Sequence, residues 1–410
     1  MASLGNIFIA GSENLGGTYK CGISYLLASK PSFSYIYYDV GGVWQVELSK
    51  DSSEVIARTA LIVSYDELQV AGFAAIQEAL DVLSVKGILS VNLADPARSS
   101  VGVYCSNGKS ILYVYSLFDF SMGMQSEIKH IDASGNVVES LLQPEPVWNE
   151  SFRYYRLSQS SGDLFEAYRN LFLAFEALLN SISPKKRSEG ERAWLKRCLS
   201  VVNIRTSLAN STPTGNEDPV DYIVSSQYEN IRCRLQHAKF PNAALPHSHP
   251  SPVYVKQAYG ELIRIWQQIA GAYFNVPTGG GVITYEGFAF IMGNAFNNGV
   301  SIYFTSDDSP PHKEDIEVSP TGSSVYEFST THFMGQVMPG VVRTIAHEDI
   351  SKLSDRYKNP IHRICTKTKT ALFGVDYIQS GLVVSGVGEW ECIHDIRLIN
   401  SSQPKIEFTT

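Results

Sequence analysis

The stretch Leu164-Phe-Glu-Ala-Tyr-Arg-Asn-Leu-Phe-Leu-Ala-Phe-Glu-Ala-Leu178 decides the fold class that the sequence predicts. Its large apolar residues recur at alternating spacings of four and three, which places them along one face of a helix. The stretch therefore predicts an amphipathic helix that buries one side. The apolar stripe consists of Leu164, Tyr168, Leu171, Phe175 and Leu178.

Three further stretches of the middle third carry apolar stripes of the same kind. About four such helices within residues 149–275 predict a four-helix bundle. The third of them is closed by Pro241, which cannot continue a helix. The three stripes are Trp194, Cys198, Val201 and Leu208; Tyr228, Ile231, Leu235 and Ala238; and Val255, Tyr259, Leu262, Trp266, Ile269 and Tyr273.

Residues 1–148, before this helical region, predict an α+β domain. Runs rich in β-branched and aromatic residues predict strands. One amphipathic helix is predicted over residues 73–83, and Gly87 follows it at a position typical of a helix end. The predicted strands cover residues 35–38, 90–93, 101–104 and 111–115, and a hairpin turn is predicted at residues 132–136.

Residues 282–410, after the helical region, predict a mainly-β domain. Strands are predicted over residues 288–291 and 300–304, on either side of the turn Asn297-Asn-Gly299, and over residues 381–384 and 396–399. The predicted fold class is therefore α+β and multidomain. Its central four-helix bundle is flanked by an N-terminal α+β domain and a C-terminal mainly-β domain.

Composition and charge restrict the function. The chain has 410 residues, 44% of them hydrophobic and 18% charged, which is typical of globular domains. No apolar run reaches the length of a membrane span, no signal peptide is predicted, and the six cysteines form no C-x-x-C pair. We therefore expect a cytoplasmic protein with no membrane partner, no metal and no cofactor. The net charge is −8, yet residues 150–275 hold 15 Lys and Arg against 11 Asp and Glu.

The segment Tyr228-Glu-Asn-Ile-Arg-Cys-Arg-Leu-Gln-His-Ala-Lys239 holds the candidate functional site. At about 100° per residue, Arg232 lies at the edge of the apolar stripe, whereas Cys233 and His237 point away from it. His237 therefore faces solvent, another helix or a partner subunit.

Arg232-x4-His237 on a third helix resembles the R-x(4–6)-H motif of the HEPN superfamily (higher eukaryotes and prokaryotes nucleotide-binding). The helix over residues 152–180 resembles those of its methylamine-utilisation (MauJ-like) group. Many HEPN members are metal-independent endoribonucleases that act as dimers. The resemblance covers the middle third only, and Cys233 stands where active members usually carry Asn, Asp or His.

The resemblance implies a dimeric endoribonuclease or RNA-binding protein in bacterial stress or antiviral defence, with Arg232 and His237 catalytic. A histidine can move the proton of the RNA 2′-hydroxyl, and an arginine can bind the scissile phosphate. Two copies that face each other across a two-fold axis would complete one cleft. The expected RNA contacts are Arg234, Lys239, Lys185, Lys186 and Arg187.

Other interpretations of the same residues remain open. Arg232 is explained equally well as an ion-pair partner of Glu229 or Glu176, and His237 as a cation at a helix C-terminus. Arg234 is a rival to Arg232, because it lies three residues before His237. In the alternative function the protein is a non-catalytic dimeric adaptor whose outer domains bind a protein or a small ligand.

Overall fold

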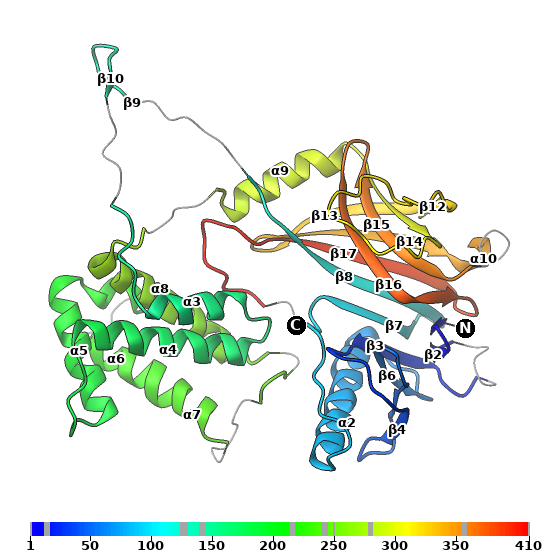
Figure 1. Ribbon diagram of the computed structural model, residues 1–410, viewed down its shortest axis with the longest axis horizontal. Helices are drawn as coiled ribbons and strands as arrows, with labels where there is room; N and C mark the ends of the chain where they lie inside the picture. Colours follow the sequence, from blue (N-terminus) through cyan, green and yellow to red (C-terminus); the bar gives the residue numbers. More distant parts are fainter. Residues whose placement is uncertain are drawn as a thin grey trace. The chain divides into compact units, whose positions relative to one another are not determined.

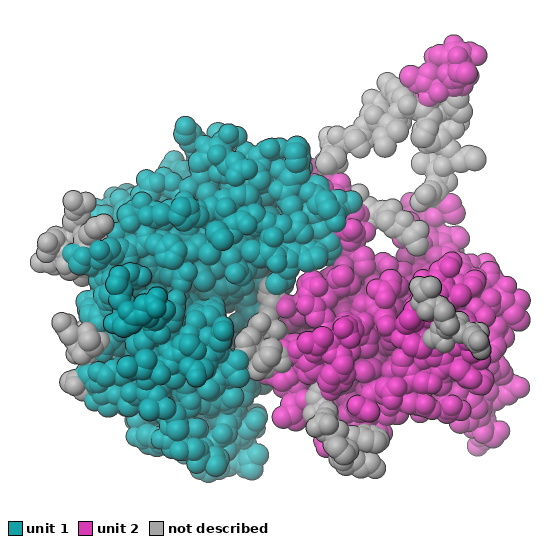
Figure 2. All heavy atoms as spheres, turned by 180° about the vertical axis from the view of Figure 1, so that it is seen from behind, with its two compact units in different colours: residues 1–121, 284–399, 410 teal, residues 122–283, 400–409 magenta. Residues whose placement is uncertain are grey.

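The chain folds into two compact units, which are coloured separately in Figure 2. The β-rich unit combines Met1–Ser121 with Thr284–Ile399, and the helical unit combines Met122–Ile283 with Asn400–Thr409. The structure is a computed structural model. It describes residues 2–11, 17–123, 130–138, 144–213, 218–238, 245–248, 251–277, 282–353 and 359–408.

Within the described residues, the β-rich unit contains one sheet of nine strands and one of six (Figure 1). In spatial order the larger sheet is β13 (Thr330–Met338), β14 (Val341–Asp349), β17 (Glu389–Leu398), β8 (Lys109–Phe120), β7 (Ser99–Ser106), β3 (Cys21–Leu26), β6 (Glu54–Thr59), β5 (Gln45–Leu48) and β4 (Tyr35–Tyr38). The smaller is β12 (Val325–Glu327), β11 (Val300–Thr305), β15 (Ile361–Thr368), β16 (Leu372–Val384), β1 (Ala2–Leu4) and β2 (Ile7–Ala10).

Strands from both ends of the chain pair with each other. β8 runs parallel to β17 over ten residue pairs, from Ile111 opposite Glu389 to Phe120 opposite Leu398. In the smaller sheet β1 pairs with β16, where Ala2 lies opposite Val384. Residues 1–148 and 282–410, which the sequence predicts as separate flanking domains, thus share both sheets.

The two sheets pack face to face around an apolar core. Phe304 and Ile364 of the smaller sheet belong to the same buried cluster as Val114 and Trp390 of the larger one. Gly374 on β16 allows a close approach, because a Cβ there would lie 2.4 Å from the Phe118 ring of β8. Alternation of inward and outward side chains along each strand creates this sandwich.

The other face of the larger sheet is covered by the segment α1 (Tyr65–Glu67), η2 (Leu68–Gly72) and α2 (Phe73–Val85). α2 buries Ile76, Leu80 and Leu83 in a cluster with Ile23 of β3. Gly87, with φ +67°, lies just after the helix, as the sequence predicts. By length and composition alone, the helical segment Tyr65–Val85 is apolar enough to cross a membrane. In this structure 44% of its most apolar 18 residues are buried inside the protein.

One predicted strand of the β-rich unit is a helix. α9 (Tyr285–Asn297) contains residues 288–291, and the Thr284 hydroxyl accepts a hydrogen bond from the Gly287 N–H at its start. Its buried residues Tyr285, Phe288, Met292 and Phe296 have helical spacing, which a four-residue window does not show. Residues 90–93 also form no strand, and α10 (Ile350–Leu353) follows β14.

The helical unit has its own core, built on the two longest helices. α4 (Leu164–Ile182) and α8 (Val253–Phe274) confirm two of the predicted helices, and their apolar residues share one buried cluster. A two-strand hairpin, β9 (His130–Ile131) and β10 (Val137–Val138), confirms the turn at residues 132–136. The remaining elements are α3 (Ser151–Ser160), α5 (Glu191–Arg205), η3 (Leu208–Ser211), α6 (Pro219–Ile223), η4 (Val224–Arg232) and α7 (Cys233–Gln236).

The C-terminal segment belongs to the helical unit. Phe408 is buried, and its ring meets that of Tyr259 edge-on with centroids 5.2 Å apart. The backbone N–H of Lys405 donates to the Gln159 side chain at 2.7 Å, and Glu407 forms an ion pair with Lys256. The last residues thus complete a core whose other members lie at least 130 positions earlier in the chain.

The predicted fold class is wrong. The protein is a β-rich α+β fold, and its helices are distributed over both units instead of gathered into a central four-helix bundle. The predicted third helix, residues 228–238, coincides with the end of η4 and with α7, which continue from α6 without a break, and α3 adds a further helix. The sequence pattern detected helical stripes correctly, but a stripe does not show how helices are divided or which strands pair across the chain.

Candidate functional site

The segment that carries Arg232 is a π-helix, η4, between the short helices α6 and α7. Asp218 starts the segment: its carboxylate accepts hydrogen bonds from the N–H groups of Val220 and Asp221, and Pro219 occupies the first turn. π-helical turns are rare and occur frequently at functional sites. The backbone of η4, which ends at Arg232, therefore departs from regular α-helix geometry.

A buried glutamine joins this π-helix to its two neighbouring helices. The Tyr168 hydroxyl on α4 donates to the backbone carbonyl and to the side-chain oxygen of Gln227, both at 2.9 Å. The Gln227 amide donates to Glu261 on α8 at 3.1 Å. Because Gln227 is only 1% exposed, these bonds replace its contact with water and fix the position of η4.

Arg232, at the end of η4, lies against α4. Its guanidinium carbon is 5.9 Å from the centre of the Phe172 ring and 5.5 Å from that of Tyr228. Its Nη2 atom is 3.9 Å from Oε1 of Glu176, which is beyond hydrogen-bond distance. Within the described residues its Nε is buried without a hydrogen-bond partner. The cation lies against two aromatic rings, and its Nε donor has no hydrogen-bond partner within the described residues.

Glu176, the nearest carboxylate, is a weak counter-ion. Burial raises the pKa of Glu176 to about 7, against a smaller opposing effect of Arg232. Near neutral pH a large fraction of this carboxyl is therefore protonated, and the charge of Arg232 is only partly compensated. Of the two ion-pair partners that the sequence proposes for Arg232, Glu176 is the one that approaches it, whereas Glu229 pairs with Arg192.

His237 and Arg234 lie in a different environment from Arg232. His237 follows the last turn of α7, is exposed, and donates its backbone N–H to the Cys233 carbonyl at 3.1 Å. Arg234 is also exposed, while Leu235 between them is buried. Within one chain the Arg232 guanidinium contacts α4, and the His237 imidazole lies beyond the helix end.

The predicted basic surface is partly neutralised. Lys185 forms an ion pair with Glu191, and nearby Arg197 pairs with Glu189 at 2.7 Å, which lowers the pKa of Glu189 to about 2. Lys186 and Arg187 are exposed and form no ion pair within the described residues. Lys239 lies outside the described residues. The positive charge available for RNA is thus smaller than the residue count indicates.

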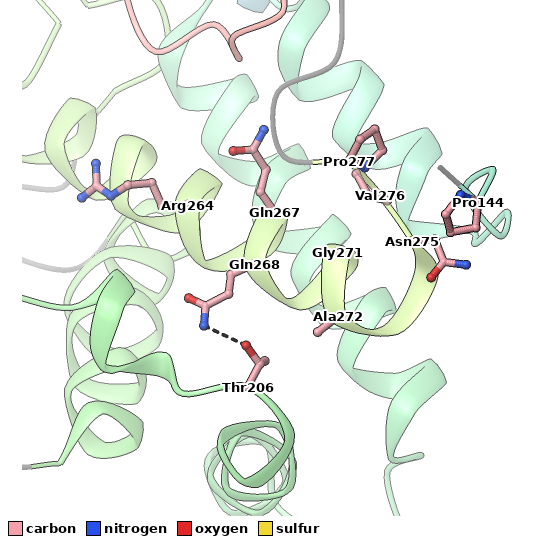
Figure 3. Close-up of a pocket in the computed structure, with 10 residues that line it drawn as sticks. All are labelled: Pro144, Thr206, Arg264, Gln267, Gln268, Gly271, Ala272, Asn275, Val276 and Pro277. Carbon is pink, nitrogen blue, oxygen red and sulfur yellow. Dashed lines mark hydrogen bonds between the residues drawn. The ribbon is translucent and has the colours of Figure 1, made fainter. Parts of the chain in front are cut away.

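A surface hollow of about 630 Å³ lies beside the C-terminal half of α8 (Figure 3). Arg264 is its charged group, and the Gln268 amide that lines it donates to the Thr206 hydroxyl at 3.0 Å, as the dashed line in Figure 3 shows. Gln268 also donates to the Ser207 carbonyl and accepts from Ser211, so its polar atoms are already engaged.

The part of the chain that the structure describes contains no group of three His, Cys, Asp or Glu residues placed to hold a metal ion. Comparison of the chain with protein-family models, with curated proteins and with solved structures finds no match. The features that bear on function are the geometry around Arg232 and the motif that contains it.

Sequence analysis missed one residue of this site and one feature of its backbone. The motif does not include Gln227, which stands four residues after Ile223 and four before Ile231, both of them apolar. This spacing is the sequence signal for a buried amide, which needs hydrogen-bond partners. No comparable signal in the sequence marks the π-helix η4.

Proposed function

We propose that the helical unit binds RNA and cleaves it as a metal-independent endoribonuclease of HEPN type, in bacterial stress or antiviral defence. Arg232 binds the scissile phosphate, and His237 transfers protons. The resemblance of the Arg232-x4-His237 motif supports this proposal, and so does the state of Arg232. The β-rich unit would then sense the target or dock a protein partner.

The observation that carries the proposal is the incomplete pairing of Arg232. An arginine side chain that is 23% exposed and lies against two aromatic rings has little conformational freedom left to lose on binding. Its nearest carboxylate lies 3.9 Å away and is partly protonated near neutral pH. A phosphate oxygen that reached this guanidinium would form the charge-assisted hydrogen bonds that Glu176 does not form.

The proposed reaction needs no metal. The 2′-hydroxyl oxygen attacks the adjacent phosphorus as its proton passes to a base, and the bond from phosphorus to the 5′-oxygen breaks as that oxygen takes a proton. The products are a 2′,3′-cyclic phosphate and a 5′-hydroxyl. An imidazole supplies either proton transfer, and the Arg232 guanidinium stabilises the charge on the phosphate in the transition state.

A second copy of the chain is part of the proposal. The Arg232 guanidinium and the His237 imidazole of one chain lie in different environments. A two-fold axis next to α7 would bring His237 of one copy towards Arg232 of the other, so that two chains form one cleft.

Another function is favoured by Cys233, which follows Arg232 where active HEPN proteins usually carry Asn, Asp or His. In that case the helical unit serves as a dimeric adaptor, and Arg232 stabilises the contact between η4 and α4. The adaptor would show neither cleavage nor binding of RNA.

Cleavage of labelled RNA by the full-length protein in EDTA tests the proposal. We expect fragments that end in 2′,3′-cyclic phosphate, and a loss of about a hundredfold or more in rate for His237→Ala. Arg169→Gln, which removes an exposed arginine of α4 that pairs with Glu166, is the matched control and keeps the rate. Equal rates for wild type and His237→Ala, with unchanged circular dichroism, would refute the catalytic role.

A further inference from the structure

Two free cysteines of the β-rich unit have their sulfur atoms in contact. Cys21 on β3 and Cys105 on β7 lie 3.8 Å apart, sulfur to sulfur. Their strands are antiparallel neighbours, and Gly22 is paired with Val103. Cys21 is fully buried, whereas Cys105 is half-buried. Cys105 is therefore the more exposed residue of the pair.

Both cysteines also contact the chain just before the helical layer. The Val63 N–H donates to the Cys21 sulfur at 3.4 Å, and the Cys105 N–H donates to the Val63 carbonyl at 3.2 Å. Val63 precedes Ser64, whose hydroxyl forms the N-terminal cap of α1 by accepting from the Glu67 N–H. The dithiol thus sits where α1, η2 and α2 join the sheet.

We propose that Cys21 and Cys105 form a reversible disulfide when the protein meets a low-molecular-weight disulfide such as oxidised glutathione. Closure requires the two sulfurs to approach by about 1.8 Å, to the length of a disulfide bond. In a reducing compartment, disulfides of this kind are transient and serve as redox sensors.

The chemistry proceeds in two exchange steps. The Cys105 thiolate attacks one sulfur of oxidised glutathione, forming a mixed disulfide and releasing one glutathione thiolate, which takes up the proton lost by Cys105. The Cys21 thiol then loses its proton and its sulfur attacks the Cys105 sulfur, which releases the second glutathione as a thiolate that takes up a proton from solvent. Two protein thiols are oxidised, and one oxidised glutathione is reduced to two molecules of glutathione.

The order of the steps follows from burial. Burial raises the pKa of the Cys21 thiol to about 12, so that little thiolate exists there at neutral pH. Cys105 is more exposed and reacts first. Closure by Cys21 is then the slow step, and its rate rises roughly tenfold per pH unit below that pKa because the thiolate fraction does.

The disulfide would link β3 to β7 next to Val63, the residue before the N-terminal cap of α1. It closes a loop of 84 residues between Cys21 and Cys105. We therefore expect the oxidised protein to melt at a temperature about 5 °C higher than the reduced protein.

Incubation of the full-length protein with oxidised glutathione, followed by acid quenching, alkylation and peptide mapping, tests the proposal. We expect the Cys21 and Cys105 peptides to be joined and short by two hydrogen atoms, and dithiothreitol to restore both thiols. Cys233 is also half-buried, and within the described residues no second thiol is in contact with it. It serves as the internal control, because it stops at the mixed disulfide.

Two cysteine variants separate the first exchange step, at Cys105, from the closure by Cys21. In Cys21→Ser the mixed disulfide at Cys105 should persist, and in Cys105→Ser the Cys21 thiol should stay free. If Cys105 of the wild type also stops at the mixed disulfide, at pH 7 and at pH 9, the proposal is overturned. The wild-type peptide map gives this result even if a variant fails to fold.

Discussion

The Nη2 atom of Arg232 lies 3.9 Å from Oε1 of Glu176, with the two side chains 23% and 20% exposed. A buried ion pair is stabilising only when its geometry is good and its remaining hydrogen bonds are satisfied. Here the distance is long, and the carboxyl has a pKa of about 7. Glu176 is therefore a weak counter-ion of Arg232, and a phosphate group could take its place.

Replacement of Glu176 should make RNA binding less dependent on pH around neutrality. In the wild type the carboxylate forms as pH rises from 6 to 8, and it then competes with phosphate for Arg232. We expect RNA affinity to fall by about fivefold over this range, equivalent to ~1 kcal/mol. In Glu176→Gln, fluorescence anisotropy should show most of that fall removed.

The matched control for this measurement is Glu166→Gln, which removes an exposed carboxylate from the same helix. It should keep the pH dependence of the wild type. If Glu176→Gln and Glu166→Gln follow the same curve, Glu176 does not compete for Arg232.

The C-terminal segment should stabilise the helical unit through one side chain. Phe408 is 6% exposed and packs on Tyr259, whereas Ile406, two residues before it, is 37% exposed. We expect Phe408→Ala to lower the free energy of unfolding by about 3 kcal/mol and Ile406→Ala by less than about 1 kcal/mol. Chemical denaturation followed by far-UV circular dichroism checks both values, and equal losses would show that the segment is not docked through Phe408.

A buried histidine should make the β-rich unit sensitive to acid. His394 on β17 is fully buried between Thr366, 2.6 Å from its Nδ1, and Cys392, 3.3 Å from its Nε2. Burial lowers the pKa of His394 to about 3, from about 6.5 in the unfolded chain. The unfolded state binds the proton more readily, so this contribution is complete above pH 6.5 and is lost as pH falls towards 3.

Between pH 7 and pH 4 the loss from His394 should reach about 3 kcal/mol. His394→Gln should be less stable than wild type at pH 7 but lose less stability on acidification. His332→Gln, at an exposed position of β13, is the control and should follow the wild type. Parallel pH curves for wild type and His394→Gln, measured by guanidinium denaturation, would be inconsistent with a neutral buried imidazole.

Local features of the fold could be predicted from the sequence, and long-range ones could not. The stripe from Leu164 to Leu178 predicts α4 because helix periodicity is a property of neighbouring residues. The pairing of Ile111 with Glu389 joins residues 278 positions apart, and no local pattern specifies that β8 and β17 are partners. The segment at Phe288 was misassigned because four residues are too few to separate the two periods.

The candidate site likewise has one feature that the sequence indicates and others that it does not. The sequence offers Glu229 or Glu176 as an ion-pair partner of Arg232, and the structure contains the contact with Glu176. It does not indicate that Phe172 and Tyr228 hold the guanidinium, or that burial weakens the carboxylate as a counter-ion. Both depend on how η4 packs against α4, which Gln227 and Tyr168 fix through hydrogen bonds.

The affinity of an uncleavable, 2′-O-methylated RNA for Arg232→Gln tests the central claim most directly. Binding without cleavage isolates the contact with phosphate from the proton transfers of His237. We predict that Arg232→Gln binds about tenfold or more weakly than wild type, and that Arg169→Gln stays within about twofold. Equal affinities for wild type and Arg232→Gln, at matched melting temperature and salt concentration, would contradict the account.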